Sequence, residues 1–94
     1  MAERNRTITP DIESRLGLRA VLAGHSVVRV APYSDHPGDW YLARVLARKI
    51  DPRDQERSFA TWLANFEAAD RPFLFEGHYE LTEAEAEVDF ARRR

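Results

Sequence analysis

The stretch VVRVAPYSDHPGDWYLARVL, residues 27–46, decides the fold because it sets two apolar runs on either side of a short polar loop. The first run, 26–31, is rich in β-branched valine and predicts a strand. The second run, 40–50, has apolar spacings that fit either a helix or a strand. A short loop of Ser, Asp, Pro and Gly between two apolar runs is typical of a hairpin, so we expect a strand over 40–48. A helix there is the alternative, and the protein would then be mostly α with a two-stranded ribbon.

The start of the second run also resembles a known strand. The pattern W-Y-x-A-R-V, residues 40–45, is similar to a strand pattern of Tudor and other SH3-like barrels. The resemblance covers less than a fifth of the chain, and the helices expected elsewhere depart from those barrels. It therefore carries no function over to this chain.

Helix-capping residues mark the element that precedes the hairpin. Thr9 can cap a helix and Pro10 is favoured at its first position. We therefore expect a helix over 10–23 that ends before Gly24. Its apolar stripe consists of Ile12, Leu16, Ala20 and Ala23. The polar residues 1–8 are expected to form a flexible arm.

A second helix is expected after the hairpin. Asp51 can cap it and Pro52 can open it, which predicts a helix over 52–69. Four large apolar residues follow the i, i+3, i+4, i+7 spacing of one buried helix face. They are Phe59, Trp62, Leu63 and Phe66.

The last quarter of the chain predicts a strand and a third helix. Residues 73–81 alternate between apolar and polar, as a half-buried strand does. Thr82 and Glu85 form a capping-box pattern ahead of a helix over 83–92. The fold expected is a small α+β domain with about three antiparallel strands. The core is expected to centre on Phe59, Trp62, Leu63, Phe66, Phe73, Phe75 and Tyr79.

Composition excludes several classes of protein. The 94 residues suit one domain, 1–94, and with no cysteine the chain cannot hold a disulfide or a thiolate site. No apolar run approaches the ~18 residues of a membrane span. We therefore expect a soluble, cytoplasmic protein without membrane contact. Residues 1–57 carry ten basic and eight acidic side chains, and 58–94 carry four and eight, so neither half resembles a strongly basic nucleic-acid binder.

The loop between the two apolar runs holds the closest group of potential metal ligands. Asp35, His36 and Asp39 lie within five positions of one another. Asp, Ser, Pro and Gly are also the residues that form turns, and we interpret this segment as a turn. The sequence contains no nucleophile elbow, P-loop or dinucleotide fingerprint. We expect no catalytic residue, cofactor or metal, and hence no enzyme.

The last helix is the candidate site for a partner. A projection at 100° per residue assigns Leu81, Ala84, Val88 and Ala91 to the core-facing stripe. An aromatic residue then lies on the opposite side inside an acidic rim, which is the composition of a small interface anchor. The predicted partner-binding residues are Glu83, Ala86, Glu87, Asp89 and Phe90.

These observations favour a small non-catalytic regulatory or inhibitor-type protein that binds another protein or a second copy of itself. In the sharper form of this hypothesis, the acidic helix imitates the phosphates of a nucleic acid. The alternative is a nucleic-acid-binding regulator that uses the region from 44 to 57 together with nearby aromatic rings. Its candidate residues are Trp40, Tyr41, Arg44, Arg48, Lys49 and Arg53.

Overall fold

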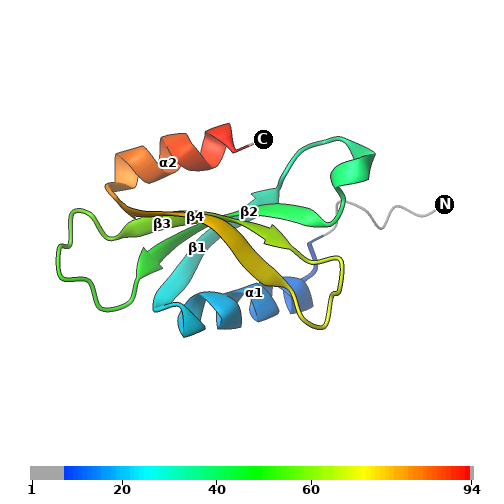
Figure 1. Ribbon diagram of the computed structural model, residues 1–94, viewed down its shortest axis with the longest axis horizontal. Helices are drawn as coiled ribbons and strands as arrows, with labels where there is room; N and C mark the ends of the chain where they lie inside the picture. Colours follow the sequence, from blue (N-terminus) through cyan, green and yellow to red (C-terminus); the bar gives the residue numbers. More distant parts are fainter. Residues whose placement is uncertain (1–7, 94) are drawn as a thin grey trace.

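The computed structural model describes residues 8–93 and shows a small α+β domain (Figure 1). Within that range, two α-helices and a four-stranded antiparallel sheet follow the element order α1, β1, β2, β3, β4, α2. A single 3-10 turn, Pro37–Asp39, interrupts the connection between β1 and β2. The bounds are α1 Pro10–Leu22, β1 His25–Pro32, β2 Leu42–Lys49, β3 Phe59–Asn65, β4 Phe73–Leu81 and α2 Glu83–Arg92.

The predicted hairpin is confirmed, because β1 pairs antiparallel with β2 over its whole length. Each later strand pairs with its neighbour in sequence, so the strand order is β1-β2-β3-β4. The mostly helical alternative for residues 40–50 is therefore wrong. No helix in the described range is long and apolar enough to cross a membrane.

The helix expected over 52–69 is wrong: an irregular loop leads into β3. β3 lies between β2 and β4 and is covered on both faces, so apolar side chains point to both sides. Trp62 and Phe66 enter one core, whereas Phe59 packs against a cluster on the opposite face. Side chains along a strand alternate between its two faces, so residues i and i+4 share a face in a strand as well as in a helix. The four-residue spacing that predicted a helix is therefore equally compatible with β3.

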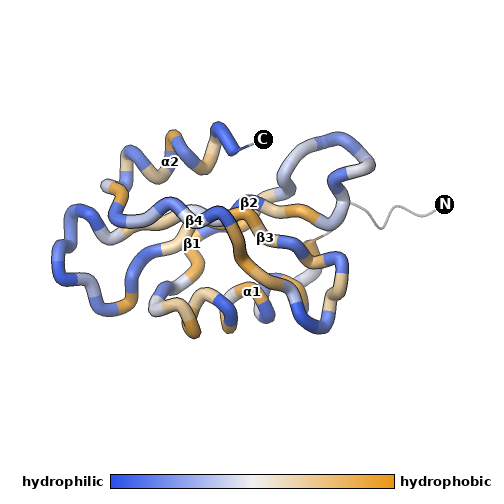
Figure 2. Tube along the Cα trace, in the orientation of Figure 1, coloured by the Kyte–Doolittle hydropathy of each residue, from blue (hydrophilic) through white to orange (hydrophobic). Residues whose placement is uncertain are grey.

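The helices cover opposite faces of the sheet, as Figure 1 shows. Thr9 caps α1 by accepting a hydrogen bond from the backbone N–H of Ile12, and α2 has the complete predicted capping box. The larger core lies between α1 and the sheet. It consists of Ile12, Leu16, Ala43, Val45, Ala47, Ala60, Trp62, Ala64 and Phe66. Figure 2 shows the hydrophobic colour concentrated in the strands between the helices, and the long loop from β2 to β3 as mostly hydrophilic.

The core between α2 and the sheet is much smaller. Its buried members are Leu46, Ala86 and Phe90. Phe59 and Leu81 pack around them. The fold is therefore asymmetric, with an apolar layer under α1 and a mixed polar and apolar layer under α2.

Both edge strands are irregular. In β1, Val27 pairs with Ala47 and Arg29 with Leu46, which leaves Val28 as an extra, bulged residue. In β4 the register shifts twice, and Glu76 and Glu80 adopt positive φ angles of 51° and 57°. These bulges twist the edges and break their pairing pattern.

The bulges in β4 also explain why part of the predicted core is wrong. Strict alternation would place Tyr79 beside Leu81, but Leu81 packs on the α2 side while Tyr79 contacts Trp62 of the α1 core. Tyr79 and Phe73 are about half exposed. Residues 1–7 of the expected arm lie outside the described range, whereas Ile8 packs against the α1 core.

Candidate protein-binding surface

The structure turns α2 the opposite way from the projection. Ala86 is 0% exposed and Phe90 6%, whereas Val88 is 50% exposed. The guanidinium groups of Arg29 and Arg44 lie 5.6 and 4.9 Å from the centre of the Phe90 ring. Phe90 therefore anchors α2 on the sheet, and the expectation that Ala86 and Phe90 are exposed to a partner is wrong.

Ion pairs neutralise much of the acidic charge of α2. Glu87 accepts two hydrogen bonds from Arg29, at 2.6 and 3.1 Å, and this contact raises the pKa of Arg29 above its ordinary value. Glu85 accepts a hydrogen bond from the backbone N–H of Thr82, which lowers the pKa of Glu85, and the charge of Arg57 acts in the same direction. These carboxylates hold the helix against its own sheet and its own loop.

Asp89 belongs to a polar cluster at the end of α2. One of its carboxylate oxygens accepts hydrogen bonds from the hydroxyl of Thr61 and from Arg93, and pairs with the His78 ring at 2.8 Å. Partial burial opposes ionisation, but the bonds from Thr61 and His78 and the charges of His78 and Arg93 together lower the pKa of Asp89. Arg93 also donates to the backbone carbonyls of Thr61 and Glu76. The cluster fastens α2 to β3 and β4.

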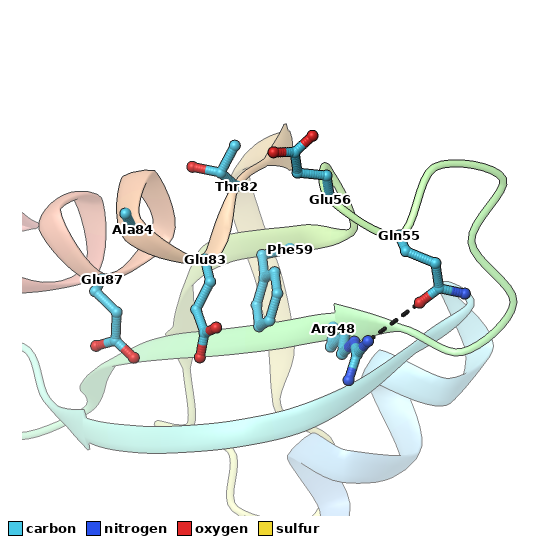
Figure 3. A pocket seen from close by; sticks show the side chains of 8 residues that line it. All are labelled: Arg48, Gln55, Glu56, Phe59, Thr82, Glu83, Ala84 and Glu87. Carbon is cyan, nitrogen blue, oxygen red and sulfur yellow. Dashed lines mark hydrogen bonds between the residues drawn. The ribbon is translucent and has the colours of Figure 1, made fainter.

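Glu83 lines a groove at the start of α2. Figure 3 shows Glu83 and Glu87 pointing from α2 toward the sheet, with the Phe59 ring and Arg48 at the base of the groove. Arg48 donates to Gln55 at 3.2 Å and lies over the Phe59 ring at 5.6 Å. The groove therefore contains an aromatic–cation contact that is already formed within the chain.

The residues of the nucleic-acid alternative are dispersed. Arg44 donates to the backbone carbonyls of Pro32 and Phe90, while Trp40 contacts Tyr41 and Phe66. The six candidates lie on both faces of the sheet and in two separate loops. They are Trp40, Tyr41, Arg44, Arg48, Lys49 and Arg53.

The loop with Asp35, His36 and Asp39 is held by its own side chains. Ser34 donates to Asp39 at 2.6 Å, and the Nδ1 atom of His36 accepts from the backbone N–H of Gly38 at 2.9 Å. Both bonds close the turn locally. Of the described residues, no three His, Cys, Asp or Glu side chains gather as metal ligands do.

Another surface stands out by exposure. Eight large apolar side chains in the described range are at least half exposed. Seven of them surround the C-terminal half of α1, and we call this set the α1 surface: Leu18, Val21, Leu22, Val28, Ile50, Phe73 and Tyr79. Leu18 and Leu22 are the most exposed, at 63% and 79%. Exposed apolar patches of this kind mark interaction sites.

The helical repeat produces the ridge of the α1 surface. Ile12, Leu16 and Ala20 face the sheet, so Leu18 lies on the opposite side of α1. Val21 and Leu22 follow Leu18 at i+3 and i+4 and extend the same outward stripe. This second stripe is visible in the sequence. The prediction for 10–23 used only the core-facing stripe and therefore did not include Leu18, Val21 and Leu22.

A hollow lies on each side of this ridge. Toward β4, the lining residues are Arg19, Leu22, Ala23, Trp62, Phe73, Leu74 and Tyr79. Toward β1 and the β2–β3 loop, they are Val21, Ser26, Val28, Arg48, Lys49, Ile50, Pro52 and Gln55. The volumes, ≈ 350 and ≈ 500 Å³, fall in the range of ligand pockets, ~300–1,000 Å³.

Rigid aromatic contacts form the wall of the hollow beside β4. The indole N–H of Trp62 donates to the Tyr79 hydroxyl at 3.0 Å, and the two rings meet edge to face. His25 packs against Trp62 with ring centres 5.0 Å apart. A Cβ on Gly77 would overlap the Tyr79 hydroxyl and approach Trp62 Nε1 to 2.7 Å. Glycine at this position therefore permits the aromatic contact.

The chain matches no protein family, no curated protein and no solved structure.

Proposed function

We propose that this protein is a small regulatory protein that acts by binding another protein through the α1 surface rather than by catalysis. One observation carries the proposal: seven of the eight large exposed apolar side chains in the described range gather around half of one helix. A domain that binds in this way regulates its partner by occupying or blocking a surface, as an inhibitor does. The acidic face of α2 is less suited, because Glu85, Glu87 and Asp89 have cationic partners within the chain.

The energetic scale fits a specific but modest interaction. Covering a large apolar side chain that is already half buried contributes roughly 1 kcal/mol, so the seven together supply on the order of 7 kcal/mol. Association itself costs about 4–15 kcal/mol. Apolar burial alone therefore gives weak binding, and polar contacts at the rim must add affinity and select the partner.

Site-specific photo-crosslinking in the native host tests the proposal. A photoreactive phenylalanine analogue at position 18 should give a discrete heavier adduct, because Leu18 lies at the centre of the ridge. The same analogue at position 88 is the matched control, since Val88 is also half exposed but lies on α2. Adding Leu22→Ser should reduce the yield of the adduct at position 18 severalfold while changing the melting temperature little, because Leu22 is 79% exposed.

Two results would contradict the proposal. The first is that positions 18 and 88 give the same adducts, or that neither position gives one. The other is an adduct at position 18 that survives Leu22→Ser unchanged. Either result would mean that the α1 surface does not select a partner.

A further inference from the structure

We infer that the partner presents an acidic amphipathic helix to the α1 surface, with one large apolar side chain seated in the hollow beside β4. This inference rests on the proposed function, because it names the chemistry of the segment that the same surface binds. It is carried by the charges of the rim, the hydrogen bonds already made in the hollow, and the position of the two hollows on either side of α1.

The rim of the α1 surface is cationic. Three charged residues among the described residues line the two hollows, and all three are basic: Arg19, Lys49 and Arg48, the last of which also lines the groove beside α2. Complementary charge steers encounters and excludes partners of the same sign. A second copy docked about a twofold axis would bring these cations together, so charge favours a different, acidic partner.

The hollow beside β4 favours an apolar side chain. The indole N–H of Trp62 is already donated to Tyr79, and Nε of Arg19 is donated to the backbone carbonyl of Pro72 at 3.0 Å. The side chains of the other lining residues are hydrocarbon: Leu22, Ala23, Phe73 and Leu74. A leucine or aromatic side chain therefore fits the hollow better than a polar one, and aromatic-lined pockets of this kind hold the anchors of interfaces.

The shape of the surface favours a helix over an added strand. The edge of β4 next to the hollow has positive φ angles at Glu76 and Glu80, which interrupts the row of backbone groups that strand addition requires. The two hollows lie on either side of α1, and a helix is about 10 Å across. Residues seven apart in a crossing helix are ~10.5 Å apart, so apolar residues at i and i+7 can reach both hollows.

Two defined probes test the charge of the partner. The probes are fluorescein-labelled, helix-forming peptides of roughly 18 residues with leucine at i, i+3, i+4 and i+7. One has glutamate on its remaining face, and the matched peptide has lysine there. By fluorescence polarisation with the full chain, the glutamate peptide should bind about tenfold more tightly at low salt, and the difference should narrow as salt screens the rim.

Matched variants locate the binding. Leu22→Ser should weaken binding of the glutamate peptide, whereas Val88→Ser on α2 should not. Lys49→Glu should weaken it by about fivefold, whereas Arg92→Glu, the same charge reversal on α2, should change it little.

The outcomes separate this inference from the proposed function. If both peptides bind alike and Leu22→Ser weakens both, the surface binds proteins but the acidic partner is wrong. If Leu22→Ser changes neither affinity, the proposed function fails as well. Dimerisation in analytical ultracentrifugation that Leu22→Ser abolishes would replace the acidic partner by a second copy. If the protein binds anionic phospholipid vesicles but neither peptide, and Leu22→Ser abolishes vesicle binding, the partner is a membrane surface instead of an acidic helix.

Discussion

Gly77→Ala measures directly how much the aromatic wall contributes to stability. The backbone of Gly77 does not have a positive φ angle, so alanine adds no backbone strain there and the expected cost arises from contacts of the added methyl group. That methyl group would overlap the Tyr79 hydroxyl and press on the buried Trp62 ring. We expect the Tyr79 ring to swing outward, because it is already half exposed. The hydrogen bond from Trp62 and the edge-to-face contact would then both be lost.

The expected cost follows from those two contacts. A hydrogen bond contributes about 0.5–1.5 kcal/mol and an aromatic pair a similar amount, so Gly77→Ala should destabilise the fold by about 1–3 kcal/mol. For a domain of this size, the melting temperature should fall by roughly 5–20 °C. Urea unfolding followed by circular dichroism gives the same free energy independently.

Gly17→Ala is the matched control. Apart from its chain neighbours and the backbone of the helix itself, no atom lies within 4 Å of a Cβ added at Gly17 in the middle of α1. Alanine there should stabilise the helix by about 1 kcal/mol. In a Tyr79→Ala background, Gly77→Ala should cost less, since the displaced ring is already gone. The role assigned to Gly77 would be refuted if Gly77→Ala were as stable as the wild type. It would also be refuted if Gly77→Ala lowered the free energy of unfolding as much in the Tyr79→Ala background as in the wild type.

Three further predictions concern the two cores and pH. Phe90→Ala should lower the free energy of unfolding by about 3 kcal/mol because the ring is 6% exposed. Val88→Ala should change it by no more than about 0.5 kcal/mol, because Val88 is half exposed. Equal melting temperatures for the two variants would mean that α2 is turned the other way. Phe66→Ala should cost about 3–5 kcal/mol by thermal melting, because Phe66 is 3% exposed in the α1 core. The pKa of Asp89 is lower in the folded chain than in the unfolded chain, where it is ~3.9, so ionised Asp89 stabilises the fold above pH ~3.9. This stabilisation is lost as the pH falls through the pKa of Asp89 in the folded chain. Asp89→Asn should therefore lower the free energy of unfolding at pH 7 by about 1–2 kcal/mol. The difference in free energy between this variant and the wild type should shrink below about pH 4, and a difference that does not depend on pH would contradict this prediction.

Local signals in the sequence predicted the ends of the fold well. Thr9 and the pair Thr82 and Glu85 act through bonds to backbone atoms three positions away, so both α-helices could be placed from a few residues. The strands over 26–31 and 40–48 followed from the turn between them, which is also local.

The errors arose where the outcome depends on distant parts of the chain. Phe59 and Leu63 lie four positions apart, as do Trp62 and Phe66, and only coverage of β3 from both sides distinguishes a strand from a helix here. The orientation of α2 depends on Arg29 and Arg44, more than forty positions before Phe90, which meet its ring. The ridge of the α1 surface was readable locally, but its two hollows need residues from β1, β4 and the β2–β3 loop.

The irregular edges of the sheet also bear on how the protein behaves at high concentration. A four-stranded open sheet has two free edges, and regular free edges act as templates for aggregation and amyloid growth. In β1, the bulge at Val28 and the terminal Pro32 interrupt the donor row, and in β4 the left-handed residues Glu76 and Glu80 do the same. The chain can therefore expose the apolar α1 surface while its backbone resists sheet-to-sheet polymerisation. Deleting Val28 would straighten the β1 edge and should make the chain more prone to form fibres.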